Sequence, residues 1–118
     1  MSEQQGAAAV PARQAEPEVI LVTITPSSMP GGQPSVDKPE VFIYKTSNPK
    51  RVKWACTDPT AKFEVEFKSE WPFYENKYDD RYPESTDIRR GCQEKVPFKY
   101  QVTVNGGTPL DPNVIVEQ

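Results

Sequence analysis

Alternating apolar and polar residues mark several short stretches of the chain as β-strands. The clearest is FEVEF at 63–67, where two phenylalanines and a valine share one face and two glutamates share the other. From this pattern and the turn residues between the stretches, we predict strands at 18–25, 40–46, 50–56, 62–68, 96–104 and 113–117. Residues 47–49, Ser-Asn-Pro, connect the second of these to the third so closely that we expect a hairpin there.

The one-sided alternation predicts an all-β fold, built as an antiparallel two-sheet sandwich in which each sheet covers the other. Leu occurs only at positions 21 and 110, and the 13 prolines would interrupt any long helix. Trp54 should be buried with a hydrogen-bond partner for its indole N–H. The predicted core consists of Trp54, Phe63, Val65, Phe67, Phe98, Tyr100 and Val102. The order of the strands stays open.

The first 17 residues have a different composition from the rest. Ala, Gln, Glu and Pro surround one large aliphatic residue, Val10, so this stretch buries too little apolar surface to offset the entropy of ordering. We therefore divide the chain into a flexible N-terminal arm, 1–17, and a single sandwich domain, 18–118. The arm is either a plain disordered tail or a segment that becomes ordered against a neighbouring subunit.

Composition excludes several classes of function. The chain has no histidine, which removes Ser–His–Asp and Cys–His catalysis, histidine proton shuttles and most zinc or copper sites. A net charge of −3 argues against nucleic acid as the main partner. No apolar stretch approaches the roughly 20 residues that span a bilayer. The N-terminus, which starts at Met1, lacks the order of a secretory signal, so we expect a cytoplasmic protein, free or incorporated into a larger particle.

Two cysteines, Cys56 and Cys92, leave two alternatives open. A disulfide between them would close a loop of about 36 residues and stabilise the fold by about 3–4 kcal/mol in the loop-entropy model. Otherwise both are reduced thiols that pack as small hydrophobic residues, which suits a chain without a secretory signal. We expect no metal site from two cysteines without histidine, and no cofactor.

The interval 69–91 is too long for an ordinary hairpin loop and is rich in aromatic residues and arginine, a composition typical of interfaces. The predicted interaction surface consists of Tyr74, Tyr78, Tyr82, Arg81, Arg89 and Arg90. The spacing of the three tyrosines would also suit one face of a short helix. In the alternative interpretation, Trp71 and Phe73 fold back and close one end of the sandwich, with the tyrosines half exposed.

Charge is distributed unevenly along the chain. Residues 45–53 contain four basic residues and no acid, whereas 64–87 contain eight acids and three basic residues. Opposite patches on one small domain would suit head-to-tail association of identical subunits. The alternative is that these are two solvated surfaces, or that the charges pair with each other across neighbouring strands.

Four stretches resemble those of small bacterial β-sandwich domains with a cupredoxin-like or immunoglobulin-like outline. They are VKWAC at 52–56, FEVEF at 63–67 followed by WPF, VPFKYQVTV at 96–104, and the closing LDPNVIVE at 110–117. The resemblance covers about half of the chain and implies a fold. Cupredoxins bind copper through two histidines and a cysteine, so the resemblance implies no copper site in a chain without histidine.

The sequence therefore favours a non-enzymatic structural or protein-interaction module, acting as a subunit of a larger assembly such as a coat, sheath or accessory protein. Its partner would be another protein or further copies of itself. The alternative is a carbohydrate-binding module that uses the aromatic residues of 69–91 as flat platforms for sugars.

Deletion of residues 1–16 tests the division into arm and domain. The melting temperature should change by no more than a few degrees, because this segment contributes almost nothing to the core. If the segment is an assembly arm, the same deletion should abolish oligomers and spare the folded monomer. Circular dichroism melting and sedimentation measure the two effects, and loss of the monomer fold would contradict the division.

Overall fold

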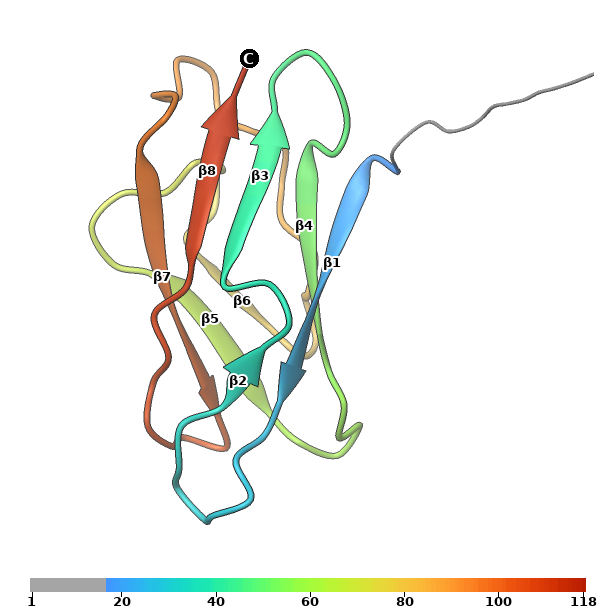
Figure 1. The fold of residues 1–118 in the computed structure, drawn as a ribbon, viewed down its shortest axis with the longest axis vertical. Coiled ribbons are helices and arrows are strands. Elements are labelled where there is room, and N and C mark those ends of the chain that lie inside the picture. The colour runs from blue at the N-terminus through green and yellow to red at the C-terminus, as the bar shows by residue number, and fades with distance from the viewer. Residues whose placement is uncertain (1–16) are drawn as a thin grey trace, which may run out of the picture.

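The computed structural model describes residues 17–118, and this part of the chain consists of strands and connecting loops, without a helix (Figure 1). The strands are β1 (Val19–Thr25), β2 (Ser35–Val36), β3 (Glu40–Tyr44), β4 (Arg51–Cys56), β5 (Phe63–Phe67), β6 (Lys77–Asp79), β7 (Pro97–Val104) and β8 (Asn113–Glu117). All six predicted strands are present, and the two short strands β2 and β6 were not predicted. The predicted arm lies outside the described residues, except for Pro17. Nothing among residues 17–118 is a helix that could cross a membrane.

Two sheets pack against each other, which confirms the predicted all-β two-sheet fold. The smaller sheet has the order β2-β1-β4, and the larger has the order β3-β8-β7-β5-β6. Antiparallel pairs link β7 to both β5 and β8, and link β5 to β6. Side chains that alternate along each strand fill the space between the sheets, as the period of two predicts.

The prediction that all strands are antiparallel was wrong in two places. β1 pairs in parallel with β4, and β3 pairs in parallel with β8. The predicted hairpin between 40–46 and 50–56 was also wrong, because β3 belongs to the larger sheet and β4 to the smaller one. Residues 45–50 carry the chain from one sheet to the other. Alternation shows that one face of a strand is buried, but a parallel neighbour and an antiparallel neighbour produce the same alternation.

The core contains every residue that the alternation placed there. Trp54, Phe63, Val65, Phe67, Phe98, Tyr100 and Val102 are all buried. The indole of Trp54 stacks on Tyr78 with a centroid separation of 5.2 Å and meets Tyr100 edge-on at 5.6 Å. Its Nε1–H donates a hydrogen bond of 3.2 Å to the hydroxyl of Tyr100, which confirms the predicted partner.

Truncation of a core ring tests this packing. Phe67→Ala or Phe98→Ala should lower the free energy of unfolding by about 3–5 kcal/mol, since each change leaves a cavity between the sheets. A small domain has only about 5–15 kcal/mol in total, so soluble yield should fall as well. Urea denaturation followed by tryptophan fluorescence measures the change. Unchanged curves for both variants would mean that these rings do not support the core.

Tyr100 gives the domain a dependence on alkaline pH. Burial raises the pKa of Tyr100 from its ordinary value of 10.0 to about 12, although the hydrogen bond with Trp54 lowers it. The folded state therefore holds the proton more tightly than the unfolded state does. This contribution to stability is complete below pH 10 and is lost as the pH rises through about 12.

Tyr100→Phe separates the two roles of the hydroxyl. At neutral pH the variant should be about 1–3 kcal/mol less stable, because the buried N–H of Trp54 loses its acceptor. Between pH 10 and about 12 its stability should fall less steeply than that of the wild type, since the residue no longer titrates. Urea denaturation at pH 7 and pH 11 measures both effects, and parallel pH profiles for the two proteins would contradict the assignment.

Candidate functional site

The aromatic segment 69–91 closes one side of the sandwich. It leaves β5, forms β6 against that strand, and returns along β4, where the N–H of Trp54 donates to the carbonyl of Pro83 at 2.9 Å. Phe73 near its beginning forms an isolated β-bridge with Ile88 near its end. Phe73 is fully buried and Trp71 is half-buried. These two residues therefore follow the alternative in which they fold back on the sandwich.

The three tyrosines of the segment do not form one surface, contrary to the prediction. Tyr78 is 5% exposed, and its hydroxyl donates to the carbonyl of Glu75 at 2.9 Å. Burial raises the pKa of Tyr78, so it remains a neutral core residue. Tyr74 and Tyr82 are 60% and 72% exposed, but Tyr74 precedes β6 and Tyr82 follows it. A strand at β6 replaces the short helix that the tyrosine spacing would also suit.

The three arginines of the predicted surface also separate. Arg81 follows the end of β6, with its guanidinium 3.8 Å from the carboxylate of Asp79. Arg89 and Arg90 lie at a cleft beside the end of β3. The chain of strand pairings makes β3 and β6 run in opposite directions, so their ends lie at opposite ends of the larger sheet. Only Arg89 and Arg90 can act together.

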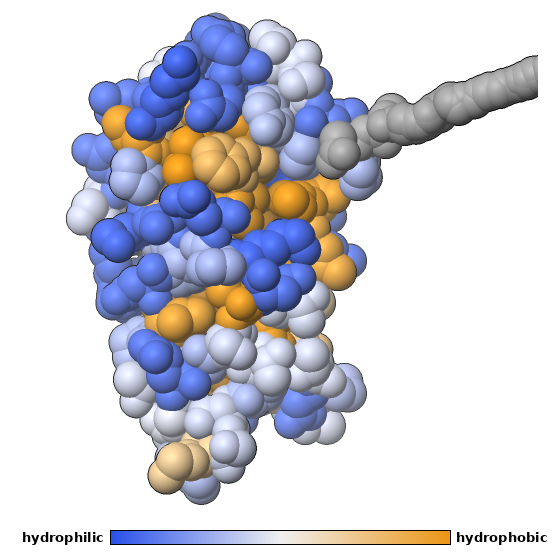
Figure 2. Space-filling view, in the orientation of Figure 1, coloured by the Kyte–Doolittle hydropathy of each residue, from blue (hydrophilic) through white to orange (hydrophobic). Residues whose placement is uncertain are grey.

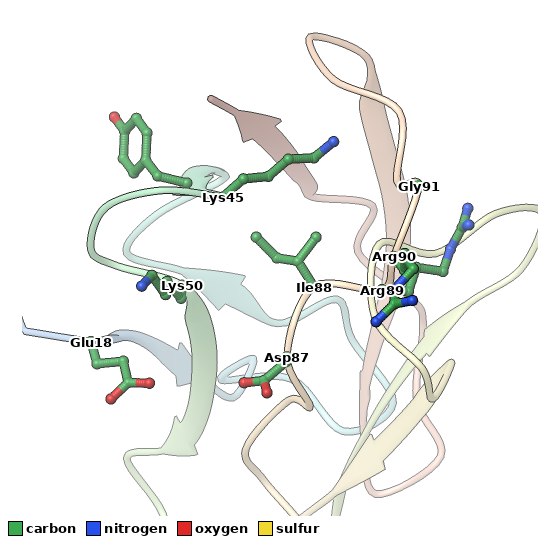
Figure 3. A pocket seen from close by; sticks show the side chains of 9 residues that line it. Glu18, Lys45, Lys50, Asp87, Ile88, Arg89, Arg90 and Gly91 are labelled. Carbon is green, nitrogen blue, oxygen red and sulfur yellow. The ribbon is translucent and has the colours of Figure 1, made fainter.

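The cleft has a volume of about 460 Å³ and unites two basic groups that are far apart in the sequence (Figure 3). Lys45 and Lys50 come from the connection between β3 and β4, and Arg89 and Arg90 come from the end of the aromatic segment. Its lining consists of Glu18, Tyr44, Lys45, Lys50, Asp87, Ile88, Arg89, Arg90 and Gly91. We call this feature the cationic cleft. Figure 3 shows Ile88 between Lys45 and Asp87, so an apolar side chain lies among the charges.

The carboxylates of the cationic cleft are held by Arg51 of β4. Its guanidinium lies 3.6 Å from Glu18 and 3.6 Å from Asp87, and also 3.4 Å from Glu84. This network ties the beginning of β1 and the returning part of the aromatic segment to β4. Glu18 and Asp87 therefore pair with Arg51, which is not one of the four cations that line the cleft.

Three of the four cations that line the cationic cleft have no ion pair within the described part of the chain. Lys45 contacts Glu94 at 3.0 Å and donates to the carbonyl of Cys92 at 2.6 Å. Among residues 17–118, no carboxylate oxygen lies within 4.0 Å of the charged nitrogens of Lys50, Arg89 or Arg90. Three cations without an ion pair thus line one concave surface, together with the carboxylates Glu18 and Asp87, which contact Arg51. Such an excess of cations attracts an anionic group.

The aromatic segment positions both arginines. Arg89 donates from Nε to the carbonyl of Trp71 at 2.7 Å and from its backbone N–H to the carbonyl of Pro72 at 2.8 Å. The backbone N–H of Arg90 donates to the hydroxyl of Tyr74 at 3.0 Å. These bonds fix the turn before a ligand arrives, which lowers the entropy that binding must offset.

The acidic residues of 64–87 do not form one opposing patch. Glu66 contacts Lys68 at 3.2 Å and Lys77 at 3.9 Å, while Glu84 and Asp87 contact Arg51. The cavity beside the end of β6 is lined by acids and bases together, namely Lys62, Glu64, Asp79, Asp80 and Arg81 with Phe63, Asn105 and Gly106. Four of the eight acids, Glu66, Asp79, Glu84 and Asp87, thus pair with basic residues, as one form of the alternative expects.

Both cysteines are free thiols in the structure. Cys56 ends β4 beside Ile24, near the end of β1, whereas the carbonyl of Cys92 contacts Lys45, which follows β3. Figure 1 shows that β1 and β3 end at opposite ends of the domain, beyond the reach of a disulfide. Burial raises the pKa of the Cys92 thiol, although Arg89 and Lys45 lower it. In residues 17–118, no group of three or more acidic or cysteine side chains is placed to hold a metal ion.

Comparisons with protein families, with curated proteins and with solved structures find no match for this chain.

Proposed function

We propose that the protein is a non-enzymatic interaction module, a subunit of a larger assembly, whose cationic cleft holds an acidic surface of a protein partner. The observation that carries this proposal is the group of three cations, Lys50, Arg89 and Arg90, that line one concave surface and have no ion pair among residues 17–118. The chain as a whole has a net charge of −3, so the local excess of positive charge is opposite to the average of the molecule.

The side chains of the cationic cleft suit carboxylates on a protein surface. Each guanidinium can bind a carboxylate through two parallel N–H···O bonds, which gives direction as well as attraction. Tyr44 and Ile88 add apolar contact area within the cleft. Arg and Tyr are enriched in protein interfaces because they combine large contact areas with directed donors.

The outline of the fold is cupredoxin-like rather than immunoglobulin-like in this proposal. Immunoglobulin-type sandwiches consist of antiparallel sheets. The parallel pairs β1/β4 and β3/β8 depart from that arrangement. Copper is not part of the proposal, because the chain has no histidine.

The carbohydrate-binding alternative receives less support. Sugar binding through aromatic platforms needs exposed rings that lie together. Tyr74 and Tyr82 are exposed, but they flank the two ends of β6, and the ring of Tyr78 between them is buried.

A charge reversal in the cationic cleft tests the proposal, with poly-L-glutamate as the probe. The wild type should bind it, and added salt should weaken the binding. The double variant Lys50→Glu/Arg90→Glu should bind about tenfold more weakly or worse, because two charge-assisted contacts become repulsions. Isothermal titration calorimetry measures the affinities, and circular dichroism checks that the variant is folded.

The matched control is Lys77→Glu/Lys99→Glu, which reverses the same number of charges at exposed positions on β6 and β7. It should bind poly-L-glutamate like the wild type. Equal losses in the two double variants would show that only net charge matters, and would contradict a specific cleft. Binding of polygalacturonate without binding of poly-L-glutamate would favour the carbohydrate alternative.

A further inference from the structure

The outer face of the larger sheet carries aromatic side chains beside the cationic cleft. Val41 and Ile43 of β3 are buried between the sheets, so Phe42 and Tyr44 point to the outside of the sandwich. Phe42 is 40% exposed and Tyr44 is half-buried. The two side chains therefore leave β3 on the same face, about 7 Å apart along the strand.

Two further apolar side chains continue this surface across the sheet. Phe42 lies beside Ile115 of β8, and Ile115 lies opposite Pro97 of β7. Ile115 is half-buried and Pro97 is exposed. Figure 2 shows hydrophobic side chains on the face of the molecule over β8 and β3. We call the surface made by Phe42, Tyr44, Ile115 and Pro97 the apolar face.

Tyr44 belongs to both the apolar face and the cationic cleft. It lines the cleft together with the cations, and it lines a hollow of about 590 Å³ together with Phe42. Its backbone N–H donates to the carbonyl of Pro49 at 2.9 Å, which holds the connection that carries Lys50 against the end of β3. One bound segment can therefore contact the cations and the aromatic rings at the same time.

The cationic cleft and the hollow beside Phe42 differ in charge. The cleft has three cations without an ion pair among residues 17–118, whereas the hollow is lined by Glu94, Lys95 and Glu117. Glu94 already contacts Lys45 at 3.0 Å. Acidic groups of a partner are thus attracted to the cleft and not to the hollow, where an uncharged apolar side chain meets the rings without repulsion.

We infer that the partner segment bound by this module is acidic and has an apolar residue beside its acids. Its carboxylates lie in the cationic cleft, and its aliphatic or aromatic side chain packs on Phe42 and Tyr44. The inference rests on the proposed function, because it names the kind of protein segment that the cationic cleft binds. Exposed apolar surface next to arginine is typical of the anchor points of protein interfaces.

The two contacts have different roles. Attraction between charges acts over a distance and guides an acidic segment to the cleft, but salt screens it. Burial of an apolar side chain against the rings acts only at contact and is not weakened by this screening. The apolar face therefore adds affinity, and it distinguishes one acidic segment from another.

Two peptides of equal charge test the inference. The leucine peptide has four glutamates flanked on each side by two leucines that alternate with serines, so an apolar residue follows the acids in either direction. The serine peptide has serine in place of every leucine, and both have blocked ends. The wild type should bind the leucine peptide about tenfold more tightly, because a leucine is removed from water. Isothermal titration calorimetry measures both affinities.

Phe42→Thr should remove most of this preference, since the exposed ring is lost while a residue that suits a strand remains. It should bind the serine peptide like the wild type, because Phe42 does not line the cationic cleft. The matched control is Leu21→Thr, because Leu21 is 46% exposed and lies on β1 of the smaller sheet. The control should keep the tenfold preference, and circular dichroism should show both variants folded.

The cleft variant Lys50→Glu/Arg90→Glu separates this inference from the proposed function. It should weaken the binding of both peptides to the same extent. Equal affinities of the wild type for the two peptides would overturn the inference and leave the proposed function standing. A wild type that binds neither peptide nor poly-L-glutamate would overturn both.

Two further results would overturn the inference alone. One is a preference for the leucine peptide that survives Phe42→Thr, because the leucines would then bind elsewhere. The other is self-association of the wild type that Phe42→Thr abolishes in sedimentation equilibrium, because a second copy would then cover the apolar face.

Discussion

The contact between Trp54 and Tyr100 joins the two sheets, and the rest of the domain is arranged around it. Trp54 belongs to β4 in the smaller sheet and Tyr100 to β7 in the larger one. Both side chains are buried, and the indole N–H donates to the phenol oxygen at 3.2 Å. A buried donor is costly without a partner, so this bond restricts how the sheets face each other as well as satisfying the N–H. Tyr78 stacks on the same indole, which draws the aromatic segment against the core.

The cationic cleft follows from this packing. With Tyr78 held on Trp54, the segment that follows must return along β4, where its backbone covers the edge of that strand. The return brings Asp87 to Arg51 and places Arg89 and Arg90 beside the connection between β3 and β4. The path of the aromatic segment thus accounts for both the stacking of Tyr78 on Trp54 and the position of Arg89 and Arg90 in the cationic cleft.

The sequence predicted the strands and the core because a buried face imposes a period of two, which is visible in FEVEF without knowledge of any neighbour. It could not predict which strands pair, since the parallel partners of β3 and β4 depend on where 45–50 crosses between sheets. The prediction placed Tyr78 on the surface because its neighbours in the sequence are polar. In the structure Lys77, Tyr78 and Asp79 form a short strand in which only the middle side chain is buried. The cationic cleft was not predicted as one site. The sequence showed a basic run at 45–53 and placed Arg89 and Arg90 on a surface with tyrosines, because the meeting of the two depends on the return of the segment along β4.

The cations of the cationic cleft lack the partners that the same chain provides for Arg51. Arg51 is surrounded by three carboxylates, whereas Lys50, Arg89 and Arg90 have none within 4.0 Å among the described residues. Clustered like charges repel each other, so this arrangement has a cost for an isolated monomer. In the proposed complex, carboxylates of the protein partner offset that cost.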